Sequence, residues 1–247
     1  VQVRREEPGD EGFWRFPDGE IVTIVCAPLP QDLRQEIPSY TNPNSADYVA
    51  LYTYADLDAL IELYGHLRML NPGNRVNFMT AADLQPDDYS SHLVLLGGVD
   101  WNAVTREVTK SRRVEIPVRQ ELRDTDDPNF NGFEVLDGDE NRVFRPVLDA
   151  SKQLLEDVTQ FYRGPNPYNK KRTVTICNGM YGRGTLGAVR ALTDARFRDR
   201  NNEYIKRRFS GESEFSILSR ILVVQGKVVT PDWTAPDTVL HEWPSRE

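Results

Sequence analysis

The sequence is short of the residues on which several function classes depend. It has two cysteines, Cys26 and Cys177, and three histidines in 247 residues. The cysteines lie in separate apolar runs, so no disulfide framework is indicated and a reducing, cytoplasmic compartment is expected. Both thiols are predicted to be buried packing residues. No metal site is predicted, because no Cys-x-x-Cys or His-Glu-x-x-His spacing occurs.

Long apolar runs are also missing. No segment approaches the roughly 20 apolar residues that a membrane helix needs, and residues 1–7 have no apolar signal-peptide core. No membrane partner is therefore expected. The sequence does not begin with Met, which is compatible with a preceding domain. Gly-x-Ser-x-Gly is absent, which leaves a serine hydrolase of that type unsupported.

Acidic residues outnumber basic ones. There are 38 Asp and Glu against 30 Lys and Arg, and the formal net charge is −8. Such a chain is a poor candidate for binding DNA over its whole surface. The length and the hydrophobic share of 39% are typical of a globular protein. We expect one α/β ligand-binding domain over residues 1–247, with a polar extension at 1–19 and an acidic hairpin excursion at 121–148.

Apolar, β-branched runs that alternate with helical patterns predict the architecture. Continuous apolar strands are typical of a parallel sheet covered on both faces. The prediction is a Rossmann-like, three-layer α/β domain with a mostly parallel sheet and a C-terminal β-hairpin formed by residues 222–224 and 228–230. The other strands are expected at 21–26, 75–79, 92–96, 114–118, 144–148 and 172–177, and the helices at 56–68, 103–110, 186–193 and 196–208.

Two glycine-rich loops after predicted strands carry the functional prediction. The carboxyl ends of parallel strands meet at one edge of a sheet, so we expect these loops to share a pocket. Their glycines allow close approach of a ligand, and Gly182-x-Gly184-x-x-Gly187 has the spacing of a phosphate-binding turn. The predicted ligand-binding residues are Gly97, Gly98, Asp100 and Asn102 in the first loop, and Asn178, Gly179, Tyr181, Gly182, Arg183, Gly184 and Thr185 in the second.

The same residues have structural explanations that stay open. Asp100 or Asn102 could cap the following helix, and the second loop could be a compact turn. Arg183 is the natural partner of a phosphate, but the basic residues around it are typical of solvated helix faces. Glu62 and His66 share a helix face, but no third metal ligand is visible.

Catalysis would need a carboxylate beside a sugar to stabilise an oxocarbenium-like transition state. Asp100 and Glu62 are the main catalytic candidates, and Asp56 and Asp58 could supply the same group. No complete catalytic constellation is apparent, so whether the chain is an enzyme, and which cofactor it takes, stays open.

Three segments carry a resemblance to a known family. The run from Arg172 to Asp194, the loop 97–102 and the closing Thr-Pro-Asp-Trp-Thr of 230–234 resemble the C-terminal region of actinobacterial helix-turn-helix regulators of the Xre type. The resemblance covers nearly the whole chain. It implies the effector or sensor half of a bacterial transcriptional regulator, with a DNA-binding domain upstream, and it implies no ligand or catalytic residues. More loosely, the chain is similar to Rossmann-like nucleotide- and nucleoside-binding domains.

These observations leave three hypotheses. The favoured one is a domain that senses a nucleotide- or nucleoside-like small molecule for a regulatory protein. The second is an enzyme that cleaves the N-glycosidic bond of NAD or a nucleoside. The third is a protein-interaction or oligomerisation module, and a homo-oligomer is compatible with all three.

Overall fold

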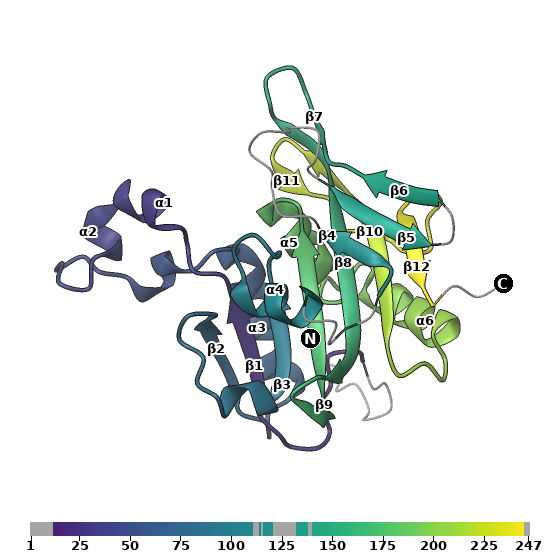
Figure 1. The fold of residues 1–247 in the computed structure, drawn as a ribbon, viewed down its shortest axis with the longest axis horizontal. Coiled ribbons are helices and arrows are strands. Elements are labelled where there is room, and N and C mark those ends of the chain that lie inside the picture. Colours follow the sequence, from purple (N-terminus) through teal and green to yellow (C-terminus); the bar gives the residue numbers. More distant parts are fainter. Residues whose placement is uncertain (1–11, 111–113, 115, 121–131, 138–139, 245–247) are drawn as a thin grey trace, which may run out of the picture.

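A computed structural model describes residues 12–110, 114, 116–120, 132–137 and 140–244 (Figure 1). Its main sheet has nine strands, seven of them in the order β11-β10-β8-β9-β3-β1-β2, while β12 pairs with β10 and β7 pairs with β8. The half of the sheet that carries the glycine loops is parallel, with β1–β2, β1–β3 and β3–β9 pairs. These strands are β1 (Val22–Cys26), β2 (Val76–Thr80), β3 (His92–Leu96) and β9 (Asn169–Gly179).

The other half is antiparallel, so the sheet is mixed rather than mostly parallel as predicted. β8 (Leu154–Asn166) pairs antiparallel with β9, and β10 (Phe215–Val224) pairs antiparallel with β8. β8 and β9 are joined by a two-residue turn, a connection that only antiparallel neighbours can use. No strand was predicted over 154–166, so the sheet was expected to be mostly parallel.

The C-terminal segment differs from the predicted terminal hairpin. β11 (Lys227–Val228) pairs antiparallel with the end of β10 through two residue pairs. The chain then continues to β12 (Val239–Trp243), which also pairs with β10 and was not predicted. A short strand, β7 (Val147–Leu148), pairs with β8.

The region of the predicted acidic excursion contributes to a second, three-stranded sheet. Its strands are β4 (Val118–Gln120), β5 (Phe133–Asp137) and β6 (Glu140–Phe144), in the order β4-β5-β6. Buried Phe133 and Val135 pack against Val158 and Leu218 of the main sheet. Residues 121–131 and 138–139, with most of the predicted acidic cluster, lie outside the described residues.

Helices cover both faces of the parallel strands, as expected for an α/β fold. Alternate side chains of a strand point to opposite faces, so Ile24 packs with Leu60 and Leu63 on one face and Val25 packs with Val104 on the other. Cys26 and Cys177 are buried, which confirms their predicted packing role, and burial raises the pKa of both thiols. The helices are α1 (Gln31–Gln35), α2 (Pro38–Thr41), α3 (Leu57–Leu70), α4 (Ala103–Lys110), α5 (Gly182–Arg190) and α6 (Arg198–Arg208), with 3-10 turns η1 (Ala50–Thr53) and η2 (Asp88–Ser90).

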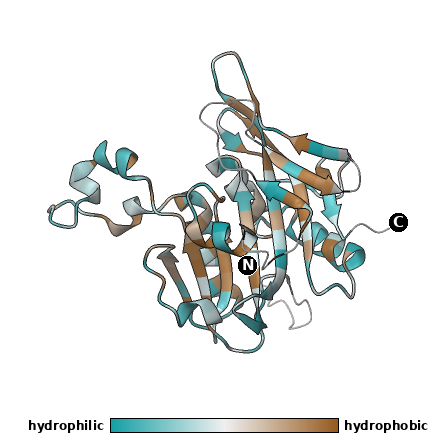
Figure 2. Ribbon diagram, viewed as in Figure 1, coloured by the Kyte–Doolittle hydropathy of each residue, from teal (hydrophilic) through white to brown (hydrophobic). Residues whose placement is uncertain are grey.

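An arm that contains α1, α2 and η1 extends from the body (Figure 1). None of these three elements buries a residue, and the arm is largely hydrophilic where the central strands are hydrophobic (Figure 2). Its base is closed by a bridge between Pro28 and Tyr54 and by a hydrogen bond from the Ala55 amide to the Ala27 carbonyl (2.9 Å). The arm thereby returns the chain to the carboxyl end of β1. Among the described helices, none has the length and apolar character to cross a membrane.

Candidate functional site

The two glycine loops meet at one edge of the sheet, as their places after parallel strands predicted. The Gly97 amide donates to the Cys177 carbonyl (3.0 Å) and so joins the ends of β3 and β9. Between the loops lies a pocket of about 440 Å³. Its lining residues come from both loops, from the start of α3 and from β4: Asp56, Gly97, Gly98, Asp100, Trp101, Gln120, Gly179, Met180, Tyr181, Gly182 and Thr185.

Asp56 lies between the two loops. A Cβ atom built on Gly97 would be 2.8 Å from Asp56 Oδ2, and one built on Gly182 would be 3.2 Å from Oδ1. Both glycines therefore leave room for this carboxylate. Asp56 has a left-handed backbone (φ 54°), and its side chain does not cap α3. A positive φ is uncommon outside glycine and often marks a functional position.

Protein surrounds the Asp56 carboxyl on most sides, although solvent reaches it through the pocket. Burial raises its pKa to about 6, and a hydrogen bond from Thr185 offsets part of this rise. Near neutral pH the group therefore exchanges readily between its protonated and ionised forms. It can accept a hydrogen bond from a ligand or transfer a proton to one.

A second carboxylate, Asp157 on β8, lies directly beneath the second loop. It is fully buried, and its Oδ2 accepts hydrogen bonds from the amides of Tyr181 (3.0 Å) and Gly184 (2.7 Å). Its Oδ1 accepts from the Val158 amide (2.8 Å). Burial raises the pKa of this carboxyl to about 7, against the opposing effect of these hydrogen bonds.

Asp157 changes how the second loop must be interpreted. The sequence predicted an anion-binding loop at 178–185. The amides of Tyr181 and Gly184, which would donate to a phosphate there, already donate to Asp157. α5 also begins at Gly182, so residues 182–185 form its first turn rather than a loop. Arg183, the predicted phosphate partner, does not line the pocket and lies 3.4 Å from Asp58 on the exposed surface.

Gln120 was not predicted, although it lines the pocket. Its Oε1 accepts hydrogen bonds from the Val99 amide (3.0 Å) and from Asn178 Nδ2 (2.8 Å). Two donors therefore fix the orientation of the amide, and Nε2 lies 3.5 Å from the Met180 sulfur. This weak acceptor leaves Nε2 able to donate to a ligand. Buried Asn178 supports the site through Gln120 rather than by lining the pocket.

Two further predicted residues have structural roles. Asn102 is fully buried, and its Oδ1 accepts from the amides of Val104 (3.1 Å) and Thr105 (3.2 Å), so it caps α4. Glu62 lies outside the pocket, where it accepts a hydrogen bond from Thr193 (2.7 Å) and pairs with Arg190 (3.3 Å). Of the two main catalytic candidates, the structure thus brings Asp100 to the pocket and not Glu62.

Substitution of Gly184 tests the packing beneath the pocket. A Cβ atom there would be 2.5 Å from Asp157 Oδ2 and 2.8 Å from Gly179 Cα. Gly184→Ala is expected to destabilise the protein by about 1–3 kcal/mol, despite the helical preference of Ala. Exposed Gly65 in α3 has open space at its Cβ position, and Gly65→Ala should stabilise by about 0.5–1 kcal/mol. Urea denaturation measures both, and equal effects of the two changes would contradict the packing.

Comparisons with known proteins do not assign a family. The chain matches no protein-family model, and a search of curated proteins finds no match. In the described part of the chain, no group of three or more His, Cys, Asp and Glu side chains is arranged to hold a metal ion.

Proposed function

We propose that the pocket binds a nucleoside-like ligand, a ribose joined to a base, and that the domain is the sensor of a regulatory protein. One observation carries the proposal: the described lining between the loops contains two carboxylates, Asp56 and Asp100, and no Arg, Lys or His. Arg183 borders an adjoining cavity that shares Asp56, Trp101, Tyr181 and Gly182 with this pocket. Carboxylates accept hydrogen bonds from sugar hydroxyls, whereas a phosphate in the pocket would meet like charge. This lining supports a nucleoside more strongly than a nucleotide phosphate.

Aromatic and amide groups support the base part of the ligand. Trp101 lines the pocket with 47% of its surface exposed, so its indole face is accessible for stacking. The oriented amide of Gln120 can donate to a carbonyl oxygen or ring nitrogen of a base. The sensor role rests on the resemblance to Xre-type regulators and on the lack of a complete catalytic constellation in the described lining.

A second candidate is hydrolysis of an N-glycosidic bond, and the raised pKa of Asp56 favours it. A carboxyl with a pKa of about 6 can stabilise an oxocarbenium-like transition state when ionised, or protonate a leaving base when neutral. In such a reaction water would add to the anomeric carbon as the bond to the base breaks. Chromatography of nucleosides and NAD incubated with the protein distinguishes this activity from binding alone.

A thermal-shift panel tests the proposal. It compares the four ribonucleosides, their 5′-monophosphates, free ribose, the free bases and inorganic phosphate. We expect at least one nucleoside to raise the melting temperature more than its base or ribose does, with no further gain from the phosphate. Stabilisation that requires the phosphate, or that inorganic phosphate reproduces, would refute this choice of ligand.

Removal of the indole is expected to weaken nucleoside binding. Stacking on an aromatic side chain contributes about 1–3 kcal/mol per base, so Trp101→Ala should raise the dissociation constant by about 5- to 150-fold. Tyr40, an aromatic residue of the arm with 47% exposure, lies outside the pocket lining and provides the control, Tyr40→Ala. Isothermal titration calorimetry measures both variants. Equal affinities in the two would exclude Trp101 as a stacking partner.

A further inference from the structure

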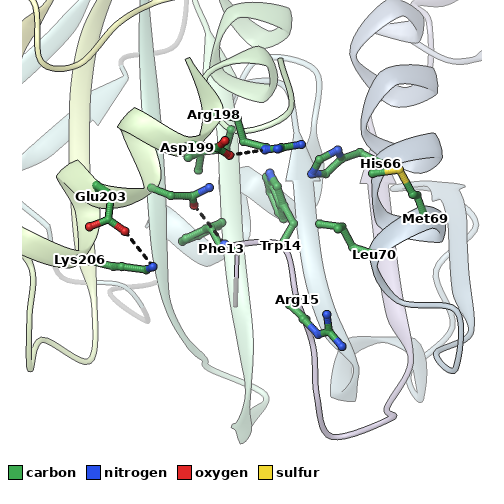
Figure 3. Close-up of a pocket in the computed structure, with 13 residues that line it drawn as sticks. Phe13, Trp14, Arg15, His66, Met69, Leu70, Arg198, Asp199, Glu203 and Lys206 are labelled. Atoms are coloured by element: carbon green, nitrogen blue, oxygen red, sulfur yellow. Dashed lines mark hydrogen bonds and ion pairs between the residues drawn. The ribbon is translucent and has the colours of Figure 1, made fainter. Parts of the chain in front are cut away.

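A second cavity, of about 400 Å³, lies between the segment 12–15, the C-terminal half of α3 and helix α6 (Figure 3). It shares no lining residue with the pocket at the glycine loops. Its size is typical of sites for small organic molecules. It is lined by Gly12, Phe13, Trp14, Arg15, His66, Met69, Leu70, Leu192, Arg198, Asp199, Asn202, Glu203 and Lys206.

Two buried side chains present nitrogen atoms without partners at this cavity. Trp14 is 1% exposed and His66 is 9% exposed. Among the described residues, neither Trp14 Nε1 nor His66 Nε2 has a hydrogen-bond partner. Edge-to-face contacts with Phe13 (5.1 Å) and Phe161 (6.1 Å) hold the Trp14 ring in place. A buried donor without a partner costs about 1–3 kcal/mol, so an acceptor on a ligand would relieve that cost.

Arg198 approaches the same point. Figure 3 shows its side chain, the Trp14 indole and the His66 imidazole converging on one end of the cavity. Arg198 Nε donates to Asp199 Oδ1 (2.8 Å), and in the described chain its terminal N–H groups have no partner. Burial and the nearby Arg198 charge lower the pKa of His66 to about 4, so the imidazole is neutral at physiological pH and the guanidinium sets the local charge.

Cations outnumber carboxylates along this wall, with Arg15, Arg198 and Lys206 against Asp199 and Glu203. The two acidic residues of the lining are already engaged, Asp199 with Arg198 and Glu203 with Lys206 (3.0 Å). The Oδ1 atom of Asn202 accepts from the Phe13 amide (3.1 Å), which leaves its Nδ2 as a further donor. Anionic oxygen atoms on a ligand would complement these donors and the excess positive charge.

The remaining wall is apolar and comes from Met69, Leu70 and Leu192. An inorganic anion would leave this surface unfilled, whereas a hydrocarbon body would cover it. We propose that the cavity binds a small organic carboxylate, with its carboxylate at Trp14 and Arg198 and its hydrocarbon body against the apolar wall. This site does not depend on the function proposed for the glycine-loop pocket.

Titration of matched acids and amides tests this proposal. The probes are phenylacetate, benzoate and hexanoate, the primary amide of each, and inorganic phosphate, followed by calorimetry and by ¹H–¹⁵N NMR. The chain has four tryptophans, and the indole N–H signal of Trp14 is the one lost in Trp14→Phe. We expect at least one carboxylate to saturate and to shift this signal, while its amide and phosphate bind at least tenfold more weakly.

The affinities of two arginine variants distinguish a specific contact with the carboxylate from nonspecific filling of the cavity. Arg198→Gln is expected to weaken the carboxylate by about tenfold or more, because a charge-assisted hydrogen bond is lost. Arg200→Gln, on the same helix but outside the cavity lining, should change affinity by less than about twofold. Three results would overturn the proposal. The first is equal affinity for an acid and its amide, and the second is an equal effect of the two variants on affinity. The third is no saturable binding of any probe at concentrations up to about 10 mM, which would place every dissociation constant above the millimolar range.

Discussion

Replacement of Asp56 by Asn is expected to stabilise the ligand-free protein and to weaken ligand binding. The pKa of Asp56 is about 6 in the folded protein and 3.8 ordinarily. Because the folded value is raised, the stabilising effect of the protonated form is complete below about pH 4 and is lost as the pH rises towards 6. At neutral pH the ionised carboxyl costs about 2–3 kcal/mol. Asn removes this charge and tolerates the left-handed backbone.

Melting temperatures at about pH 5 and about pH 8 measure this effect. The Asn variant should exceed the wild type at both values, and the difference should be larger at the higher pH. Asp58→Asn is a suitable control, because Asp58 lies on the same helix but its side chain is 73% exposed. A difference in melting temperature that does not change with pH, or that Asp58→Asn reproduces, would contradict this prediction. It would show that ionisation of Asp56 does not destabilise the folded protein.

Replacement of Asp157 by Ala is expected to have the opposite effect on stability. The substitution removes, at a fully buried position, the carboxylate that accepts from the Val158 and Tyr181 amides. It also removes one of the two acceptors of the Gly184 amide, whose other acceptor is the Tyr181 carbonyl (2.9 Å). Each buried amide without a partner costs about 1–3 kcal/mol, so the two amides that lose their acceptor give an expected loss of about 2 kcal/mol or more. Because the Tyr181 and Gly184 amides belong to the second loop, the nucleoside proposed for the pocket should also bind more weakly.

Urea denaturation of three variants tests this role. Asp157→Asn keeps one acceptor oxygen and removes the cost of ionising a buried carboxyl whose pKa is about 7, so it should be more stable than Asp157→Ala. Glu156→Ala is the control, because Glu156 makes only a partly exposed ion pair with Arg220 (3.0 Å), which is worth about 1 kcal/mol or less. If Asp157→Ala unfolds at the same urea concentration as Glu156→Ala, the carboxylate does not hold the loop.

Strands and helices with a clear apolar pattern could be predicted from the sequence. The predicted strands 21–26 and 92–96 agree with β1 and β3, and the helix 56–68 agrees with α3 to within two residues at its C-terminal end. The meeting of the two glycine loops followed from the same parallel strands. These features depend on local periodicity, which the sequence displays directly.

The missed features depend on contacts between distant parts of the chain. β8 contains Glu156, Asp157 and a Gly-Pro pair, so its polar residues hid the strand. α5 begins four residues earlier than predicted because Asp157, 27 residues away, accepts the Gly184 amide. Gln120 gave no local signal, since only its contacts with Val99 and Asn178 bring it to the pocket.

We propose that Asp56 and the two glycine loops bind a nucleoside. Calorimetric titration of the best nucleoside from the panel into the wild type and Asp56→Asn tests it most directly. A hydrogen bond to a charged group is worth about 1.5–3 kcal/mol, so the variant should bind about 10- to 100-fold more weakly while remaining folded. Equal affinity in the two proteins would contradict the claim, because the ligand would then bind without the carboxylate that the two loops enclose.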